Sequence, residues 1–322
     1  MKLGSIGTSN ITRMFLSAAK AAGGIEHTAV YSRSYENGIR FAKETGGCVF
    51  TDLLEMAESD LIDAVYIASP NRFHYAQSKV FLEHGKHVLC EKPLTTTKAQ
   101  EEELIVLAEG EGLVYSEAIM SIHTPAFETL RGALAKIGTV RTANLVFCQL
   151  SSRYQGFLSG IRQNIFDPEL HAGCLMDIGV YNVYLAAALF GKPREVFSDA
   201  VFLSTGADGS GSAVLRYDGL TVNLIYSKVG QNYAPSEIIG DEGTLQIGSV
   251  SQLTGIELIT KDGTQTLVEK TKTRDEVMGA EAAYFRDTVQ NGYNDAYEFA
   301  KQTSLTVREI TDTIRRQNGF PF

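Results

Sequence analysis

The sequence predicts an α/β protein with an N-terminal doubly wound parallel sheet and a C-terminal α+β domain that contains a large, mostly antiparallel open sheet. Two observations carry this prediction. Over residues 1–118, apolar strand patterns alternate with helical patterns, which is typical of a parallel sheet with helices on both faces. Over residues 196–268, β-rich runs are separated by tight turns such as Asp218-Gly219 and Asp262-Gly263, which favours antiparallel strands. We therefore expect one domain over 1–118 and a second over 119–322.

Short apolar strands, mostly followed by helices, define the first domain. The strands are Leu3–Ile6, His27–Tyr31, Ala64–Ala68, His87–Cys90 and Leu113–Tyr115. The helices cover 11–22, Ser34–Thr45 and Phe73–His84, and a fourth begins at Thr97, whose spacing to Gln100 is that of a capping box. In the second domain, we expect a strand over Val140–Leu150 and helices over Pro125–Lys136, Leu175–Phe190, Val277–Gln290 and Ala296–Gln317.

Composition restricts the partners of this chain. Of 322 residues, 44% are hydrophobic and 21% charged, which suits an ordinary globular core. The net charge of −9 makes nucleic acid a poor partner, because phosphate contacts need clustered Lys and Arg. No apolar run approaches the roughly 20 residues that span a bilayer, and the N-terminus leaves no room for a signal peptide. We expect a cytoplasmic protein with four reduced cysteines, no membrane partner and no metal site.

The loop after the first strand has the position of a dinucleotide-binding turn. It contains Gly4 and Gly7 and leads through Thr8, Ser9, Asn10 and Ile11 into the first predicted helix. Glycines at this point let the backbone approach a pyrophosphate, and the helix N-terminus offers free N–H groups. The match to G-x-G-x-x-G is incomplete, because Ser9 stands where a glycine is expected. An ordinary strand–helix turn is therefore the alternative interpretation.

The end of the second strand favours a phosphorylated cofactor. A site for NAD usually has an acidic residue here for the ribose hydroxyls. This chain has Ser32 and Arg33 instead, and a guanidinium suits a 2′-phosphate. We expect NADP as the cofactor, with NAD as the alternative; Arg33 as a solvated loop residue is the competing interpretation.

Polar residues also follow two later strands. Ser69-Pro70-Asn71 with His74 follows the third predicted strand, and Glu91-Lys92-Pro93 follows the fourth. In an open parallel sheet, ligands bind outside the carboxyl ends of the strands. We therefore include Ser69, Pro70, Asn71, His74, Glu91 and Lys92 among the candidate cofactor-binding residues.

Taken together, these segments resemble the Gfo/Idh/MocA oxidoreductases. The resemblance rests on Ile6-Gly7-Thr8, on the Ser69 and Glu91 segments, and on 172–181 in the second domain. It implies that Lys92 lies beside the nicotinamide and polarises the reacting oxygen, that the Lys92–Pro93 bond is cis, and that Asp177 orients the substrate or Lys92. Tyr181 would be the acid/base, with a water or His123 as the alternative proton carrier. Tyrosine at this position is similar to the glucose-fructose oxidoreductase and dimeric dihydrodiol dehydrogenase branch, which uses NADP, and so is the Glu117-Ala118 segment.

The resemblance implies hydride transfer between a nicotinamide and a hydroxyl or carbonyl carbon of a sugar, polyol or diol. Glu117 would then bind cofactor, and Arg162, in the loop 151–171, would bind substrate. Two alternatives remain: a redox-assisted glycosidase that holds NAD, and a non-catalytic nucleotide-binding regulator. By resemblance we also expect a homodimer or homotetramer joined through open sheet faces, with apolar alternation at Val214, Val222, Leu224 and Tyr226.

Overall fold

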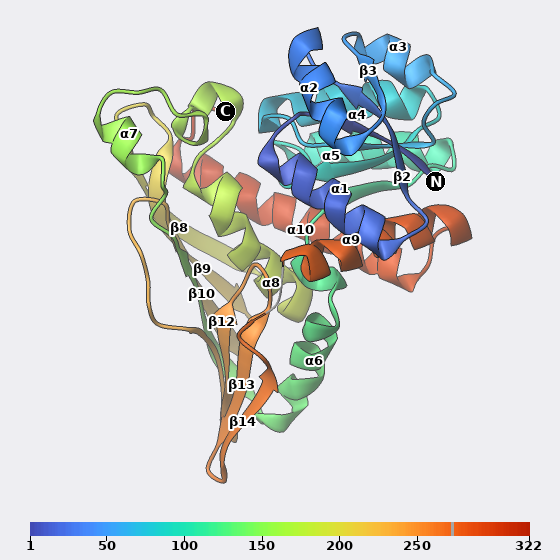
Figure 1. Ribbon diagram of the computed structural model, residues 1–322. Helices are drawn as coiled ribbons and strands as arrows, with labels where there is room; N and C mark the ends of the chain where they lie inside the picture. The colour runs from blue at the N-terminus through green and yellow to red at the C-terminus, as the bar shows by residue number, and fades with distance from the viewer. Residues whose placement is uncertain (272–273) are drawn as a thin grey trace. The chain divides into compact units, whose positions relative to one another are not determined.

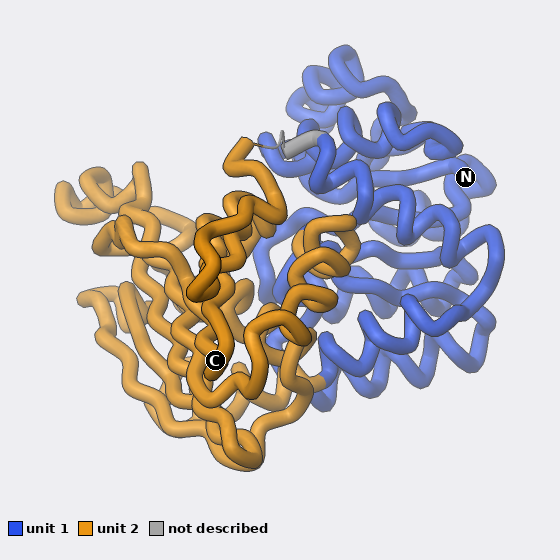
Figure 2. The backbone as a smooth tube through the Cα atoms, turned by 90° about the horizontal axis from the view of Figure 1, so that it is seen from below, with its two compact units in different colours: residues 1–120, 273–305 blue, residues 121–272, 306–322 orange. Residues whose placement is uncertain are grey.

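The chain folds into two compact units (Figure 2), and the computed structural model describes residues 1–271 and 274–322. Unit 1 contains residues 1–120, helix α9 and the first part of helix α10, up to Leu305. Unit 2 contains the chain from Ser121 through strand β14, together with Thr306–Phe322. This grouping differs from the expected division at 118/119, because α9 and part of α10 return to unit 1.

Unit 1 is built on a parallel sheet of six strands in the order β3-β2-β1-β4-β5-β6 (Figure 1). The strands are β1 Lys2–Ile6, β2 Glu26–Tyr31, β3 Cys48–Phe50, β4 Ala64–Ile67, β5 His87–Glu91 and β6 Tyr115–Ala118. The helices between them are α1 Asn10–Ala22, α2 Tyr35–Thr45, α3 Leu53–Glu58, α4 His74–Glu83 and α5 Lys98–Gly110. The predicted doubly wound fold is confirmed. The strand order reverses between β1 and β4, and a crevice at such a point is where ligands bind.

Three details of unit 1 differ from the prediction. Strand β3 and helix α3 were not predicted, since three and six residues are too few to show a hydrophobic period. The last strand is Tyr115–Ala118, not Leu113–Tyr115. It contains Ser116 and Glu117, which are buried although polar, so hydropathy did not reveal it.

Helix α9 (Arg274–Asn291) belongs to unit 1 because it packs along α1. Arg286 donates hydrogen bonds to the carbonyl oxygens of Ala22 (2.8 Å) and Gly23 (2.6 Å). These carbonyls lie at the C-terminal end of α1, where a cation is favourable. The link joins residues more than 260 positions apart, and no local sequence pattern predicts it.

Unit 2 contains an eight-stranded sheet in the order β14-β13-β12-β11-β7-β10-β9-β8. The strands are β7 Val140–Cys148, β8 Glu195–Phe202, β9 Asp208–Tyr217, β10 Leu220–Ser227, β11 Ser236–Gly240, β12 Gly243–Ser249, β13 Thr254–Thr260 and β14 Gly263–Val268. All neighbours pair antiparallel except β7 and β10, which confirms the mostly antiparallel sheet. Helices α6 Pro125–Ala133, α7 Tyr154–Leu158, α8 Val180–Phe190 and the end of α10 (Asp295–Asn318) complete the unit.

One face of this sheet is covered by α8 (Figure 1). Three of the four residues expected to alternate on the open face, Val222, Leu224 and Tyr226, are fully buried on the covered face, so that part of the prediction was wrong. Only Val214, which pairs with Asn223, lies on the opposite face. The alternation was real, but its apolar members make the core of unit 2.

The helical region before and within α8 is very apolar. Pro168–Phe190 has the length and hydropathy of a membrane span, but 83% of its most apolar window is buried inside the protein. A mostly buried helix of this kind is typical of the core of a globular domain. The predicted helix 175–190 is also not uniform, since Leu175–Gly179 forms a π-helical turn before α8 begins.

Candidate active site

The turn after β1 is shaped for close approach of a ligand. Gly7 has φ 103°, and a Cβ atom there would lie 2.7 Å from the carbonyl oxygen of Ala68. The next residues lead into α1, whose N-cap Ser9 makes no side-chain cap hydrogen bond. The first N–H groups of α1 are therefore left for another acceptor, and a pyrophosphate is the acceptor that such helix ends bind. Gly7, Thr8, Ser9, Asn10 and Ile11 thus fit the predicted role.

The end of β2 contains no carboxylate. Ser32 is buried, its hydroxyl donates to the carbonyl oxygen of Ser34 (2.8 Å), and the Ser34 N–H lies 3.3 Å from the same hydroxyl. Arg33 is exposed, and no ion pair to it occurs within 1–271 and 274–322. An exposed guanidinium at a strand end without a carboxylate fits a 2′-phosphate. The Ser32 hydroxyl would have to rotate to reach such a phosphate.

His74 joins the loops that follow β4 and β5. Its ring is buried, with Nδ1 2.8 Å from the carbonyl oxygen of Pro93 and Nε2 2.8 Å from that of Ser69. Burial lowers the pKa of His74, although the two carbonyls oppose this shift. A neutral imidazole has one N–H, so one of these contacts is the hydrogen bond. The Ser69 hydroxyl donates to Gln77 (2.6 Å), and Asn71 opens a short 3₁₀ turn after Pro70.

The segment around Lys92 is held by side chains on both sides of it. The Lys92–Pro93 bond is cis, which confirms the expectation. Before it, the carboxylate of Glu91 accepts a hydrogen bond from the Tyr66 hydroxyl (2.5 Å). After it, the carboxylate of Glu117 accepts from the N–H of Leu94 (2.8 Å) and from the Ser304 hydroxyl (2.6 Å).

We call the three side chains of His74, Glu91 and Glu117 the lysine frame. The sequence predicted all three as cofactor-binding. The structure shows what they do within unit 1: they fix the backbone that carries Lys92. Cofactor contact by these residues stays a prediction.

A buried acid near the frame was missed. Glu281 of α9 is 1% exposed, and neither carboxyl oxygen has a hydrogen-bond partner within the described part of the chain. Burial, and the charges of Glu91 and Glu117, raise the pKa of Glu281 well above its usual range, which favours its protonated form. The sequence did contain a signal, because Glu281 lies one turn from both Val277 and Phe285 on a buried stripe.

The predicted substrate residues Asp177 and Tyr181 lie in unit 2. Asp177 is in the π-helical turn, where a spacing of four residues no longer equals one turn. Its carboxylate forms an ion pair with Lys228, a residue that the sequence did not suggest. Tyr181 is 8% exposed, and its ring packs edge-on against Phe147 with centroids 6.0 Å apart. The π turn is notable because such turns are frequent at functional sites.

A second buried carboxyl supports this helix start. The carboxylate of Asp208 accepts a hydrogen bond from the N–H of Leu175 (2.7 Å), at the first residue of the π turn. Burial raises the pKa of Asp208 to about 7. Gly173 has φ 154° and no space for a side chain, because a Cβ atom would lie 1.9 Å from the Asp208 carboxylate. Asp208 and Gly173 therefore place the turn that carries Asp177.

The structure also shows the environment of two other predicted residues, Arg162 and His123. Arg162 is 70% exposed at its side chain and pairs with Asp167 and Glu169 (2.7 Å to the latter), so its charge is used within its own loop. A substrate role for Arg162 stays a prediction.

His123 is buried, which lowers its pKa to about 3. Such an imidazole is neutral at working pH, which argues against His123 as the proton donor in place of Tyr181.

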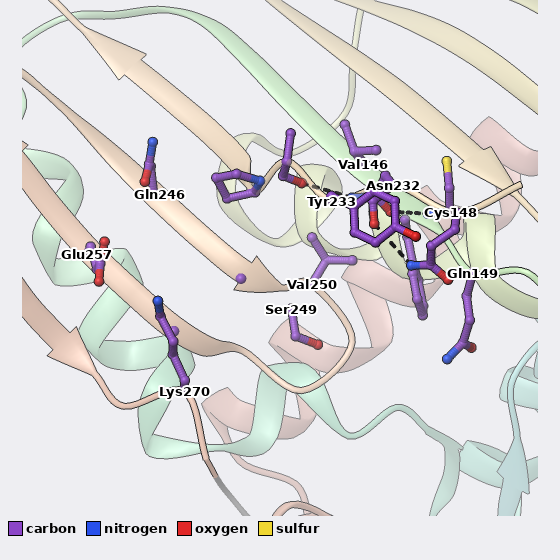
Figure 3. Close-up of a pocket in the computed structure, with 16 residues that line it drawn as sticks. Val146, Cys148, Gln149, Asn232, Tyr233, Gln246, Ser249, Val250, Glu257 and Lys270 are labelled. Atoms are coloured by element: carbon purple, nitrogen blue, oxygen red, sulfur yellow. Dashed lines mark hydrogen bonds between the residues drawn. The ribbon is translucent and has the colours of Figure 1, made fainter.

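A separate hollow of about 430 Å³ lies in unit 2, between the end of β7, the segment 231–235 and strands β12 and β13 (Figure 3). Asn232 shapes it by accepting from the N–H of Cys148 (2.8 Å) and donating to the carbonyl oxygen of Ala234 (2.8 Å). None of the predicted site residues lines this hollow.

Among the described residues, no group of three or more His, Cys, Asp or Glu could hold a metal ion.

Known proteins show the same architecture. Residues 1–119 match the model of an oxidoreductase family with an NAD-binding Rossmann fold, and residues 127–246 match the GFO/IDH/MocA C-terminal domain. The chain is 42% identical over 318 residues to scyllo-inositol 2-dehydrogenase (NADP(+)) IolU of Bacillus subtilis (strain 168), covering 98% of this chain and 97% of that protein. It is 34% identical over 258 residues to dTDP-3,4-didehydro-2,6-dideoxy-alpha-D-glucose 3-reductase of Streptomyces violaceoruber, covering 77% and 72%. KijD10, a 3-ketoreductase from Actinomadura kijaniata in complex with TDP-benzene and NADP, has a TM-score of 0.84 at 25% identity, covering 99% of this chain and 98% of that chain.

Proposed function

Since the chain belongs to the Gfo/Idh/MocA family of oxidoreductases, we propose that it is an NADP-dependent enzyme that transfers a hydride to or from a sugar, polyol or diol. The observation that carries this proposal is the lysine frame, which fixes Lys92 after β5 in the same unit as the uncapped N-terminus of α1. A relative that matches almost the whole chain is named as an NADP(+) dehydrogenase of a cyclic polyol, which supports both the cofactor and the substrate class.

Each residue has a defined role in the proposed reaction. When bound, the nicotinamide donates or accepts the hydride. The ammonium of Lys92 donates a hydrogen bond to the reacting oxygen and stabilises negative charge that develops there. The Tyr181 phenol gives its proton to that oxygen in reduction, and its phenolate takes the proton in oxidation. Asp177 orients the substrate, and Ser32 with Arg33 receives the 2′-phosphate.

One assay tests this function. The protein is incubated with NADPH or NADH and a panel of cyclic ketones and ketoses, and the absorbance of the reduced nicotinamide is followed. We expect consumption of NADPH with at least one ketone of a polyol. Cleavage of an aryl glycoside without net cofactor turnover would show a redox-assisted glycosidase instead. Cofactor binding without either reaction would show a regulator.

We also propose that the protein is cytoplasmic and forms a homodimer or homotetramer. Support for assembly comes from the face of the unit 2 sheet opposite α8, where Phe197, Val201 and Ile225 are 50%, 59% and 47% exposed. Exposed apolar side chains gathered on one sheet face are typical of an association surface. Light scattering at micromolar concentration tests the proposal, and a monomer mass would contradict it.

A further inference from the structure

The residues that follow helix α10, 319–322, fold back onto unit 2 beside the loop that carries α7 (Figure 1). Gly319 has φ 64°, the left-handed conformation that commonly follows the end of a helix. The N–H of Phe320 then donates to the carbonyl oxygen of Arg315 (3.1 Å), and its ring packs edge-on against Phe202 of β8, with centroids 5.1 Å apart. These contacts bring Phe322 to a defined place on unit 2.

Arg315 of α10 holds Phe322 in two ways. Its guanidinium carbon lies 5.1 Å from the centroid of the Phe322 ring, and its Nη2 donates to the main-chain oxygen of Phe322 (2.5 Å). Arg315 itself is 8% exposed and forms an ion pair with Asp312 (3.1 Å). A cation over an aromatic ring contributes more when the cation is removed from water. The position of the Phe322 ring is therefore fixed by a buried side chain.

The same ring supports an unusual backbone conformation in the loop 151–171. Phe322 stacks on His171, with ring centroids 5.0 Å apart and ring planes 12° from parallel. His171 has φ 53° and ψ 39°, in the left-handed region that is uncommon for residues other than glycine. Conformations of this kind persist where the surrounding structure supports them. The stack with Phe322 supplies such support.

His171 connects two parts of unit 2 that contain predicted substrate residues. Before it, Asp167 forms the ion pair with Arg162 and accepts at its main-chain oxygen from the N–H of Leu170 (3.1 Å). After it, the chain continues into the π-helical turn Leu175–Gly179, which contains Asp177. The backbone conformation of His171 therefore sets how the loop leaves this turn.

We propose that Phe322, fixed by Arg315, holds His171 and thereby positions the loop 151–171 for substrate binding. Phe322 is a positioning residue in this scheme, because it acts through His171. The proposal rests on the proposed function and on the predicted substrate role of Arg162 in this loop. Loss of the Phe322 ring should loosen the loop and raise KM for the substrate, while kcat and cofactor affinity change little.

Limited proteolysis tests the positioning without any use of the activity. Trypsin cleaves after arginine, and Arg153 and Arg162 are both exposed in this loop, but the loop must open locally to fit the protease. At a temperature where all variants are folded, Phe322→Ala should be cleaved there roughly 2- to 10-fold faster, the factor that corresponds to one aromatic pair. Phe322→Tyr retains the ring and should be cleaved like the unmodified protein.

Two comparisons show whether the effect passes through His171. In a His171→Ala background, Phe322→Ala should add little, because the stack is already lost. The matched control is Phe190→Ala, which removes a ring from the pair with Tyr217 at the end of α8 opposite to the π turn. If Phe322→Ala does not fold, Phe322→Leu keeps an apolar side chain without the stack and is compared in the same way.

The substrate role is then measured with a ketone that the unmodified protein reduces. KM for the ketone should rise roughly 2- to 10-fold in Phe322→Ala, with kcat and the Kd for NADPH nearly unchanged. Three results would overturn the proposal: cleavage of Phe322→Ala no faster than that of Phe190→Ala, additive effects of the two substitutions, or an unchanged KM. If the unmodified protein reduces no ketone, the proposed function fails, whereas the cleavage rates still decide whether Phe322 holds the loop.

Discussion

Removing the Glu117 carboxylate should free the Lys92 segment from its support. Glu117 is 4% exposed and accepts two hydrogen bonds, from the Leu94 N–H (2.8 Å) and from the Ser304 hydroxyl (2.6 Å). In Glu117→Ala, the buried Leu94 N–H loses this acceptor, which costs about 1–3 kcal/mol, and the charged hydrogen bond to Ser304 is lost as well. In Glu117→Gln, the amide oxygen still accepts from Leu94 and the amide nitrogen can donate to Ser304. The alanine variant should therefore be the less stable by roughly 2–5 kcal/mol.

Two measurements separate a support role from a general loss of structure. Thermal unfolding should show a clear decrease in Tm for Glu117→Ala and a small one for Glu117→Gln, with Glu111→Ala, at an exposed glutamate after α5, as the control. At a temperature where all variants are folded, kcat should fall up to roughly 10²-fold in Glu117→Ala, because Lys92 is misplaced, while KM for NADPH changes little. An alanine variant with unchanged kcat would refute the role of the frame. A glutamine variant as poor as the alanine variant would show that the charge, and not the hydrogen-bond geometry, is what matters.

Three further predictions concern the cofactor, the acid/base pair and pH. Ser32→Asp should reverse or abolish a preference for NADPH over NADH by repelling the 2′-phosphate, and equal binding curves for the two cofactors in the unmodified protein would contradict the premise. Lys92→Ala and Tyr181→Phe should each lower turnover by at least about 10²-fold, and the double variant should be little worse than the poorer single one, because the residues act as a unit. Because the pKa of Asp208 is raised to about 7, the folded protein holds a proton that the unfolded chain releases at lower pH. Stability should therefore fall as pH rises towards and through about 7, and Tm should depend less on pH in Asp208→Asn.

The sequence predicted the parts of the fold that depend on local pattern. The alternation of strands and helices gave the parallel sheet, and the capping box at Thr97 and Gln100 is present as expected. The position of α9 was beyond such reasoning, because Arg286 meets the end of α1 through contacts between distant parts of the chain. Strand β6 was shifted because two of its four residues, Ser116 and Glu117, are polar but buried.

The site was predicted less completely, for a physical reason. A motif shows which polar residues gather at the strand ends, but not which of them face a ligand and which hold other residues. His74 and Glu117 are residue types that often bind ligands, yet their side chains contact the backbone of Pro93 and Leu94, directly after Lys92. Lys228 belongs to no sequence motif. Its ion pair with Asp177, 51 positions earlier, forms only in the folded chain and could not be predicted from a local pattern.

Two buried carboxyl groups, those of Glu281 and Asp208, lie near the proposed site residues of units 1 and 2. Burying them lowers the stability of the fold, so their presence calls for an explanation. Glu281 lacks any hydrogen-bond partner among the described residues, and Asp208 has one carboxyl oxygen in the same condition. Each such group is unfavourable by about 1–3 kcal/mol compared with an apolar residue of similar shape. A fold under selection for stability alone would replace them. Glu281 interacts with Glu91 and Glu117 of the lysine frame, and Asp208 holds the first residue of the π turn that carries Asp177, so both acids lie where backbone and charge are fixed. Glu281→Gln and Asp208→Asn should therefore be neutral or stabilising at pH 8 by thermal unfolding, yet reduce turnover, and a variant with both higher Tm and full activity would show that the buried acid serves neither half of the site.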